Sequence, residues 1–116
     1  MTRPCVIFDI DGTVADCSHR LHFIKRDGVF GTSRPKRILH PTVSWLHVHA
    51  PWLSSYQTYM RADDDRRSSA EVKADYLDKM ARDGFRPIYA FEDRAQDAAM
   101  WRAAGITCLQ VAEGNY

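Results

Sequence analysis

The sequence predicts an α/β fold, in which one domain is built around a mainly parallel sheet. Its 116 residues suit a single domain and leave no room for two. Short apolar runs that end abruptly in acidic or turn residues indicate strands buried on both faces, as in a parallel sheet. These runs alternate along the chain with segments of helical spacing. We therefore expect residues 1–116 to form one three-layer, Rossmann-like domain.

The amino-terminal half is predicted to hold strands on either side of one helix. The run from Pro4 to Asp9 is apolar up to its last residue, and a second apolar patch, Val29-Phe30, leads into Gly-Thr-Ser-Arg-Pro. Residues 41–48 are predicted to be helical, because a proline near a helix start costs no hydrogen bond. Residues 56–60 could form a further strand.

The carboxy-terminal half shows clearer alternation. Ser68 followed by Glu71 matches the capping box, and the apolar residues that follow at helical spacing predict a helix ending near Asp83-Gly84. A strand is expected over 87–91, a helix over 95–104 and a last strand over 106–111.

The charge is nearly balanced overall but uneven along the chain. Sixteen Lys and Arg against fifteen Asp and Glu give a net charge of +1, which excludes a polycation that binds nucleic acid through its total charge. Residues 17–49 nevertheless hold six Lys or Arg, all five His and one acid, Asp27. Two interpretations stay open for this segment: a solvated face, or a local surface that binds anions.

Membrane and disulfide-rich classes are not expected. No apolar run reaches the roughly 20 residues that a membrane span needs, and no signal peptide opens the chain. The three cysteines, Cys5, Cys17 and Cys108, lack the CxxC spacing of a zinc site and are odd in number. Cys5 and Cys108 are expected to be buried in strands, and a reducing, cytoplasmic location fits best.

Pairs of carboxylates stand at the ends of two predicted strands, Asp9 with Asp11 and Glu92 with Asp93. Ligands of parallel sheets bind beyond the carboxyl ends of the strands. Four converging carboxylates repel one another unless a cation joins them, and an all-oxygen donor set suits Mg²⁺. The alternative is that Glu92 and Asp93 merely cap the next helix, where acids are favoured.

Two stretches carry a resemblance to a known family. Phe8-Asp9-Ile10-Asp11-Gly12-Thr13-Val14 resembles the first motif of the haloacid dehalogenase superfamily, and residues 90–116 resemble the end of the phosphatase domain of bacteriophage-type polynucleotide kinase. The resemblance covers residues 4–24 and roughly 29–116. Only 23 positions separate Asp9 from Thr32, which implies a deletion between the first two motifs and no cap domain there.

The resemblance implies roles for the paired carboxylates. Asp9 would be the nucleophile that forms an aspartyl-phosphate, and Asp11 would be the general acid and then the base. Mg²⁺ would be held by Asp9, Asp11, Glu92 and Asp93.

Further roles follow from the same resemblance. Thr32 would grip the phosphoryl group, Lys73 would offset its charge, and Arg20 and Arg34 would bind substrate, Arg34 pairing with it or with a scaffold acid. Two positions depart from the family. Ser33 stands where glycine is typical, and Ser69 stands where this branch commonly has an aspartate four residues before the lysine.

The resemblance implies a Mg²⁺-dependent phosphomonoesterase, acting on the 3′-phosphate of a nucleic-acid end. A nucleotidase that acts on free nucleotides is one alternative. The shortened first segment, Ser33 and Ser69 favour another, a weakened or inactive module that binds phosphate, nucleic acid or protein. The shortened segment could also be completed by a second subunit, so a dimer is possible. No GxxxxGK(S/T) motif supports a kinase activity.

Overall fold

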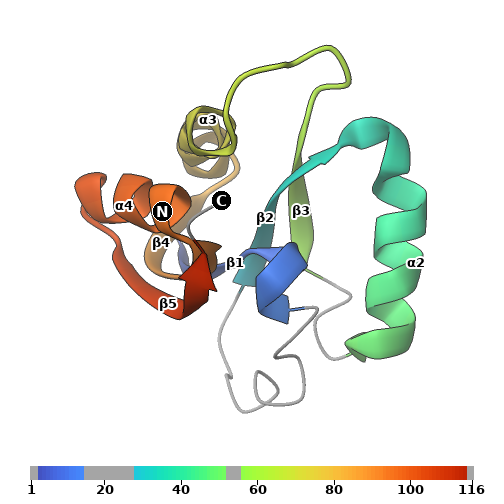
Figure 1. Cartoon of the computed structure of the whole chain (residues 1–116), viewed down its shortest axis with the longest axis horizontal. Coiled ribbons are helices and arrows are strands. Elements are labelled where there is room, and N and C mark those ends of the chain that lie inside the picture. Colours follow the sequence, from blue (N-terminus) through green and yellow to red (C-terminus); the bar gives the residue numbers. More distant parts are fainter. Residues whose placement is uncertain (1–2, 15–27, 52–55, 115–116) are drawn as a thin grey trace.

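The computed structural model describes residues 3–14, 28–51 and 56–114 (Figure 1). One sheet of five strands lies at its centre, in the order β3-β2-β1-β4-β5, and every neighbouring pair is parallel. The strands are β1 Arg3–Phe8, β2 Gly28–Pro35, β3 Gln57–Arg61, β4 Phe85–Arg94 and β5 Thr107–Gly114. The predicted α/β class with a parallel sheet is confirmed.

Helices cover both faces of this sheet. Figure 1 shows α3 and α4 on one side and α2 on the other. The helices are α2 Leu39–His49, α3 Ser69–Arg82 and α4 Ala95–Ala103, with a short turn η1 at Ile10–Val14 and a 3₁₀ turn η2 at Lys36–Ile38. Within the described ranges, no helix is long and apolar enough to cross a membrane.

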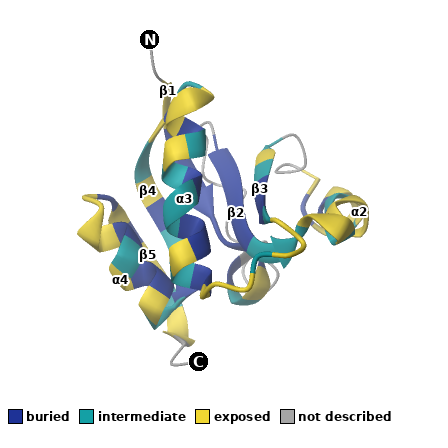
Figure 2. Ribbon diagram, turned by 90° about the horizontal axis from the view of Figure 1, so that it is seen from above, coloured by how far each residue is buried: buried dark blue, intermediate teal, exposed yellow. Residues whose placement is uncertain are grey.

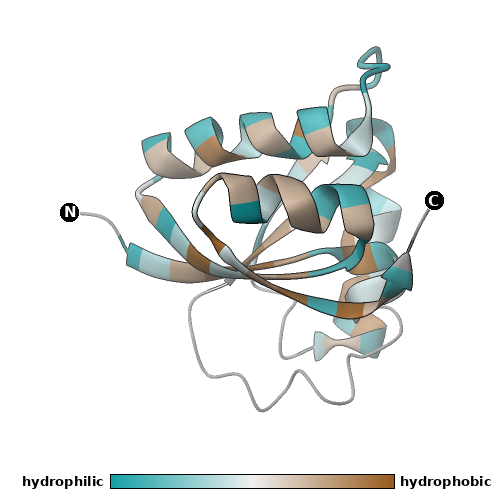
Figure 3. Ribbon diagram, turned by 60° about the vertical axis from the view of Figure 1, so that its left-hand side comes forward, coloured by the Kyte–Doolittle hydropathy of each residue, from teal (hydrophilic) through white to brown (hydrophobic). Residues whose placement is uncertain are grey.

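Strand β1 connects the two layers of the core, because successive side chains of a strand point to opposite faces. Cys5 and Ile7 pack with α3 and α4, while Val6 and Phe8 pack with α2. Figure 2 shows buried residues along α3 and α4 where they lie over the sheet, and Figure 3 shows that apolar residues gather between α3, α4 and the strands beneath them. The larger residues of the first layer are Tyr76, Met80 and Trp101; those of the second are Phe30 and Leu46.

Helix α3 begins as the capping box predicts. Ser68 is the N-cap, and its hydroxyl accepts a hydrogen bond from the backbone N–H of Glu71 at 3.3 Å. The same hydroxyl donates to the Glu71 carboxylate at 2.9 Å. Local sequence therefore sets where this helix starts.

Several strands are longer than predicted, because pairing with a neighbour extends them. Strand β2 continues beyond Val29-Phe30 to Pro35, which pairs with Arg61 of β3. Strand β4 continues to Arg94, so Glu92 lies inside the strand, opposite Gln110 of β5. These extensions bring polar residues to one end of the sheet.

The strand order reverses direction between β1 and β4, since the chain moves outward to β2 and β3 and then returns. In open parallel sheets, ligands bind in the crevice beyond the strand ends at such a point. The segment 15–27, with Cys17 and the predicted substrate ligand Arg20, lies outside the described residues.

Candidate active site

Asp9 stands at the carboxyl end of β1, where the sheet reverses. Its backbone N–H donates to the carbonyl of Phe91 at 3.1 Å, which ties the residue to β4. The chain then turns through Gly12, whose φ of 76° is a conformation that glycine adopts freely. This turn brings the hydroxyl of Thr13 back to Asp9, where it donates to Oδ2 at 3.2 Å. The nucleophile predicted from the motif is thus anchored on both sides.

Three buried carboxylates form a cluster at this point. Asp9, Glu92 and Asp93 each offer an oxygen, and these atoms lie within 4.8 Å of one another. Glu92 and Asp93 lie in β4, before the N-cap of α4, which is Arg94 and makes no side-chain capping hydrogen bond. The cluster lines an open pocket of about 120 Å³, whose other lining residues are Asp11, Gly12, Ser33, Ser69, Lys73, Arg94 and Asp97.

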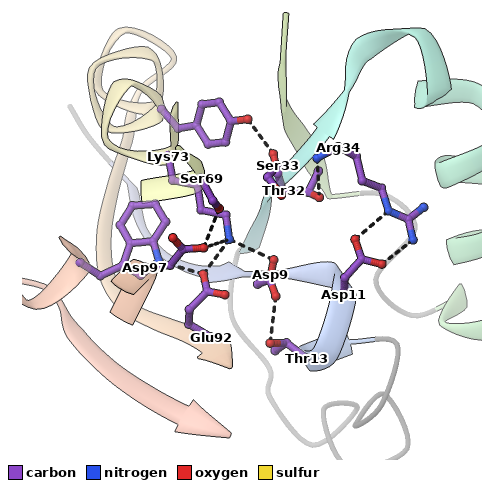
Figure 4. Close-up of polar contacts among 12 residues, drawn as sticks. Asp9, Asp11, Thr13, Thr32, Ser33, Arg34, Ser69, Lys73, Glu92 and Asp97 are labelled. Carbon is purple, nitrogen blue, oxygen red and sulfur yellow. Dashed lines mark hydrogen bonds and ion pairs between the residues drawn. The ribbon is translucent and has the colours of Figure 1, made fainter. Parts of the chain in front are cut away.

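Lys73 reaches the cluster from α3, and only 1% of its surface is exposed. Its ammonium donates to Asp9 Oδ1 at 3.1 Å, to Glu92 Oε2 at 2.9 Å and to Asp97 Oδ2 at 2.8 Å (Figure 4). An ammonium group has three N–H donors. Each of them therefore meets a carboxylate.

Burial and charge act against each other on these groups. Burial raises the pKa of Asp9 to about 8, although the nearby Lys73 ammonium acts in the opposite direction. Burial also raises the pKa of Glu92. For Lys73, burial alone would lower the pKa, but the surrounding carboxylates outweigh it and the pKa is raised. Lys73 stays charged, while the carboxylates favour a further cation.

The donor set fits a hard divalent cation. Glu92 Oε2 accepts from Lys73 and, at 3.2 Å, from the indole N–H of Trp101. Its other oxygen, Oε1, is buried and has no hydrogen-bond partner in the described part of the chain. A buried carboxylate oxygen left without a donor, beside two further carboxylates, is a ligand that Mg²⁺ could use.

Asp11 lies outside the cluster, although the sequence analysis placed it among the metal ligands. Its two oxygens accept from Arg34 Nη2 at 2.7 Å and Nε at 2.9 Å, a bidentate pair. Arg34 also donates to the hydroxyl of Thr42 in α2 at 3.1 Å. The hydrogen bonds from Arg34 lower the pKa of Asp11. Arg34 thus pairs with a scaffold acid here.

Thr32 is fully buried within β2 and does not line the pocket, whereas Ser33 does. The Thr32 hydroxyl accepts from the backbone N–H of Arg34 at 3.2 Å, and its carbonyl accepts from Tyr76 at 2.6 Å. Ser33 is not strained by replacing the family's glycine. Among the described residues only glycines have a positive φ, so the backbone at Ser33 is in a conformation that any residue adopts.

Asp97 and Ser69 complete the site, and sequence reasoning gave neither a catalytic role. Asp97 looks like an acid that favours a helix N-terminus. Its place on α4 could have pointed to a role in the site, because Asp97 lies on the buried side of the helix with Ala98 and Trp101. An acid on the apolar face of a helix needs a partner, and Lys73 and Ser69 supply it.

Comparison with known proteins agrees with this architecture. The sequence model of the polynucleotide kinase PNKP phosphatase domain matches residues 25–116. Two solved structures, described as the Pnkp1/Rnl/Hen1 RNA repair complex and the Pnkp1/Rnl/Hen1 complex, are similar to this chain with TM-scores of 0.80 and 0.82. Each is 20% identical and covers 99% of this chain. No curated protein sequence matches.

The chain belongs to the family of polynucleotide kinase PNKP phosphatase domains, since the match spans most of its length. At 20% identity, the solved structures establish the shared fold. The chain spans less than half of the two matched chains, 44% and 48%. The family match begins at residue 25, so the first motif is connected to the family by the resemblance of Asp9–Thr13 and by the fold.

Proposed function

We propose that this chain is a Mg²⁺-dependent phosphomonoesterase that forms an aspartyl-phosphate on Asp9 and removes 3′-phosphates from nucleic-acid ends. One observation carries the proposal. The Asp9 carboxylate is held by Lys73 and Thr13 beside two further carboxylates, in an open pocket at the reversal point of the sheet. Membership of a phosphatase family supports the reaction class.

Asp9, Glu92 and Asp93 would hold the metal ion, with Glu92 contributing Oε1. When bound, Mg²⁺ supplies positive charge that lets an anionic nucleophile approach a phosphate dianion. Lys73 cannot do this alone, because its three donors already serve three carboxylates.

Asp9 attacks phosphorus with one carboxylate oxygen, and the bond from phosphorus to the ester oxygen breaks as the new P–O bond forms. Its orientation is set before substrate arrives, because Lys73 holds Oδ1 and Thr13 holds Oδ2. Such preorganisation favours a near-attack geometry. Water then attacks the phosphorus of the aspartyl-phosphate, which releases phosphate and restores the carboxylate.

Asp11 serves both steps from the opposite wall of the pocket. It donates a proton to the leaving alcohol and then removes one from the attacking water. The bidentate contact with Arg34 favours the ionised form, which suits the second step. For the first step, Arg34 must exchange Asp11 for the anionic substrate, so Arg34 acts both as scaffold and as substrate ligand.

Thr32 and Arg20 complete the proposed substrate contacts. The Thr32 hydroxyl accepts from Arg34 N–H and keeps its own hydrogen to donate, so a small movement toward the pocket would let it meet a phosphoryl oxygen. Arg20 belongs to the basic segment 17–49 and would face the phosphate or the nucleic-acid backbone.

The choice of substrate rests on the family and on the open site. One of the similar solved structures is described as an RNA repair complex, so a nucleic-acid end, and RNA in particular, is the substrate to test first. An open pocket of about 120 Å³ accommodates a terminal phosphate while the rest of the polymer stays outside.

Phosphate release separates the possible functions. The panel holds a 3′-phosphorylated oligoribonucleotide, its DNA counterpart, a 5′-phosphorylated oligonucleotide and a nucleoside monophosphate, each with Mg²⁺ and with EDTA. We expect Mg²⁺-dependent release from the 3′-phosphorylated ends, none after Asp9→Asn, and unchanged release after Asp64→Asn, which alters an exposed acid.

Other results would identify a different function. Release from the nucleoside monophosphate alone would identify a nucleotidase. Binding of oligonucleotides without turnover on any substrate would identify a binding module. Full activity in Asp9→Asn would overturn the nucleophile assignment.

A further inference from the structure

We propose that Asp97 is the positioning residue of this site, and that it holds the Lys73 ammonium against the nucleophile Asp9. The inference rests on the proposed phosphatase function but concerns a residue on a different element. Asp97 lies in the first turn of α4, whereas Lys73 comes from α3 and Asp9 from the end of β1. The contact therefore joins both helices of one layer to the reaction centre.

The three partners of Lys73 are not equivalent. Asp9 is the proposed nucleophile, and Glu92 belongs to the carboxylate cluster that would hold the metal. Both attract the Lys73 ammonium less strongly during the catalytic cycle. The carboxylate of Asp9 loses its charge when it is phosphorylated, and the charge of Glu92 is shared with the cation when the metal binds. Asp97 lies outside that cluster and makes the shortest of the three contacts, 2.8 Å. It is the partner that can hold Nζ in place throughout.

Asp97 is itself held rigidly. Only 1% of its surface is exposed, and its Oδ2 accepts from the Ser69 hydroxyl at 2.7 Å as well as from Lys73. Its other oxygen, Oδ1, is buried without a hydrogen-bond partner among the residues that the structure describes. A buried carboxylate with one oxygen left unsatisfied is costly for stability, so this side chain is better explained by the site than by folding.

The geometry also shows how the carboxylate of Asp97 could be transferred to another helix. Ser69 and Lys73 are four residues apart on α3, which places their side chains on the same face of the helix. The Ser69 hydroxyl is already 2.7 Å from the oxygen that Lys73 contacts. A carboxylate at position 69 would therefore reach the same ammonium from the lysine's own helix, if position 97 were emptied to make room.

The experiment uses this exchange. Asp97→Asn keeps the shape of the side chain and removes its charge, while the double variant Ser69→Asp/Asp97→Ser keeps composition and charge and transfers the carboxylate to α3. We expect Asp97→Asn to lower kcat by about 10–100-fold, the usual effect of losing such a supporting contact, with KM for the 3′-phosphorylated oligonucleotide within about twofold. The double variant should have a kcat at least tenfold higher than that of Asp97→Asn. Asp78→Asn, an exposed change on α3, should match the wild type.

A second readout does not depend on turnover. Three carboxylate acceptors should keep the Lys73 ammonium protons from exchanging with water, so they should give a ¹H–¹⁵N signal that is absent in Lys73→Met. We expect this signal in the wild type and the double variant, and its loss by exchange in Asp97→Asn. If the wild type hydrolyses no phosphate ester, the proposed function fails, and this signal still tests the position of Lys73.

Two results would overturn the role of Asp97. One is a wild-type kcat and an unchanged ammonium signal in Asp97→Asn. The other is a folded double variant, with the melting temperature of the wild type, that is no more active than Asp97→Asn and gives no ammonium signal.

Discussion

At the scale of single residues, the pocket combines four buried carboxylates with one buried ammonium. The carboxylates are Asp9, Glu92, Asp93 and Asp97, and the ammonium is that of Lys73. Burial of unbalanced like charges destabilises a folded protein. The arrangement therefore places a cost on folding that a bound cation would relieve, which is typical of functional sites.

Asp9 should make the metal-free protein less stable as the pH rises. Its folded-state pKa is about 8, whereas an unperturbed aspartate titrates near 3.9. The folded state therefore keeps a proton that the unfolded state has lost, and the stability present below about pH 4 is lost as the pH rises through 8. Urea unfolding in EDTA at pH 6 and pH 9 should show a fall of at least about 1 kcal/mol, given about 1.4 kcal/mol per pKa unit.

The matching control removes the titrating group. Asp9→Asn should show a smaller fall between these pH values and should be the more stable protein at pH 9, whereas Asp64→Asn should behave as the wild type. An equal fall in Asp9→Asn would assign the dependence to another group.

Gly12 is required both by its backbone conformation and by its neighbour. At a φ of +76°, a Cβ at this position would lie 2.2 Å from Asp93 Oδ2. Gly12→Ala should therefore lower the free energy of unfolding by about 1–2 kcal/mol from strain alone, and should also displace Asp93 and weaken Mg²⁺ binding. Urea unfolding and isothermal titration with MgCl₂ measure the two effects.

Gly84→Ala separates the two causes. Its φ is +89°, but a Cβ there would meet no atom within 4 Å. It should show the strain without the loss of Mg²⁺ affinity. Equal Mg²⁺ affinity in Gly12→Ala and Gly84→Ala would contradict the proposed place of Asp93 at the metal.

At the scale of elements, each component of the site comes from the end of a strand or from a face of a helix. Strand β1 delivers Asp9, β4 delivers Glu92 and Asp93, and α3 delivers Lys73. Helix α3 is amphipathic, and its buried residues include Val72, Lys73 and Tyr76. Lys73 thus lies on the buried face of α3, about one turn after the helix begins at Ser69.

Removing the cap should loosen this helix. Ser68→Ala removes an acceptor for the Glu71 N–H, and losing an N-cap of this kind costs about 1 kcal/mol. Urea unfolding should show that loss in Ser68→Ala. Ser44→Ala, an exposed change inside α2, should be neutral or slightly stabilising, because alanine favours helix interiors. Equal stability of Ser68→Ala and the wild type would show that packing alone sets the start of α3.

At the scale of the whole molecule, the strand order β3-β2-β1-β4-β5 decides which residues meet. Asp9 and Asp93 are far apart in sequence, and they become neighbours because β1 and β4 are adjacent and parallel. The pocket is therefore a product of the complete sheet, and a ligand bound there should stabilise the fold globally.

Mg²⁺ should raise the melting temperature of the protein. A ligand at tenfold its dissociation constant stabilises the folded state by about 1.4 kcal/mol. Thermal unfolding with MgCl₂ should show this rise in the wild type and a much smaller one in Asp93→Asn, with KCl at equal ionic strength as the control. A rise of the same size in Asp93→Asn would remove this residue from the metal site.

Local patterns predicted much of the fold. Apolar runs identified the buried strands, and the capping box identified the start of α3 to the residue. Strand ends were predicted less well, because β4 and β5 are extended by pairing with each other up to Arg94 and Gly114. Pairing of this kind depends on residues distant in the sequence.

The sequence by itself determined the fold class and brought Asp9, Glu92 and Asp93 to one edge, because parallel strands share the direction in which they end. Only the tertiary structure decided how the charges are shared. It turned Asp11 away from the cluster to Arg34 and placed Asp97 of α4 against Lys73 of α3. Contacts between elements depend on how helices pack across the sheet, which no local pattern records. A buried charge then takes whichever partners that packing brings within reach.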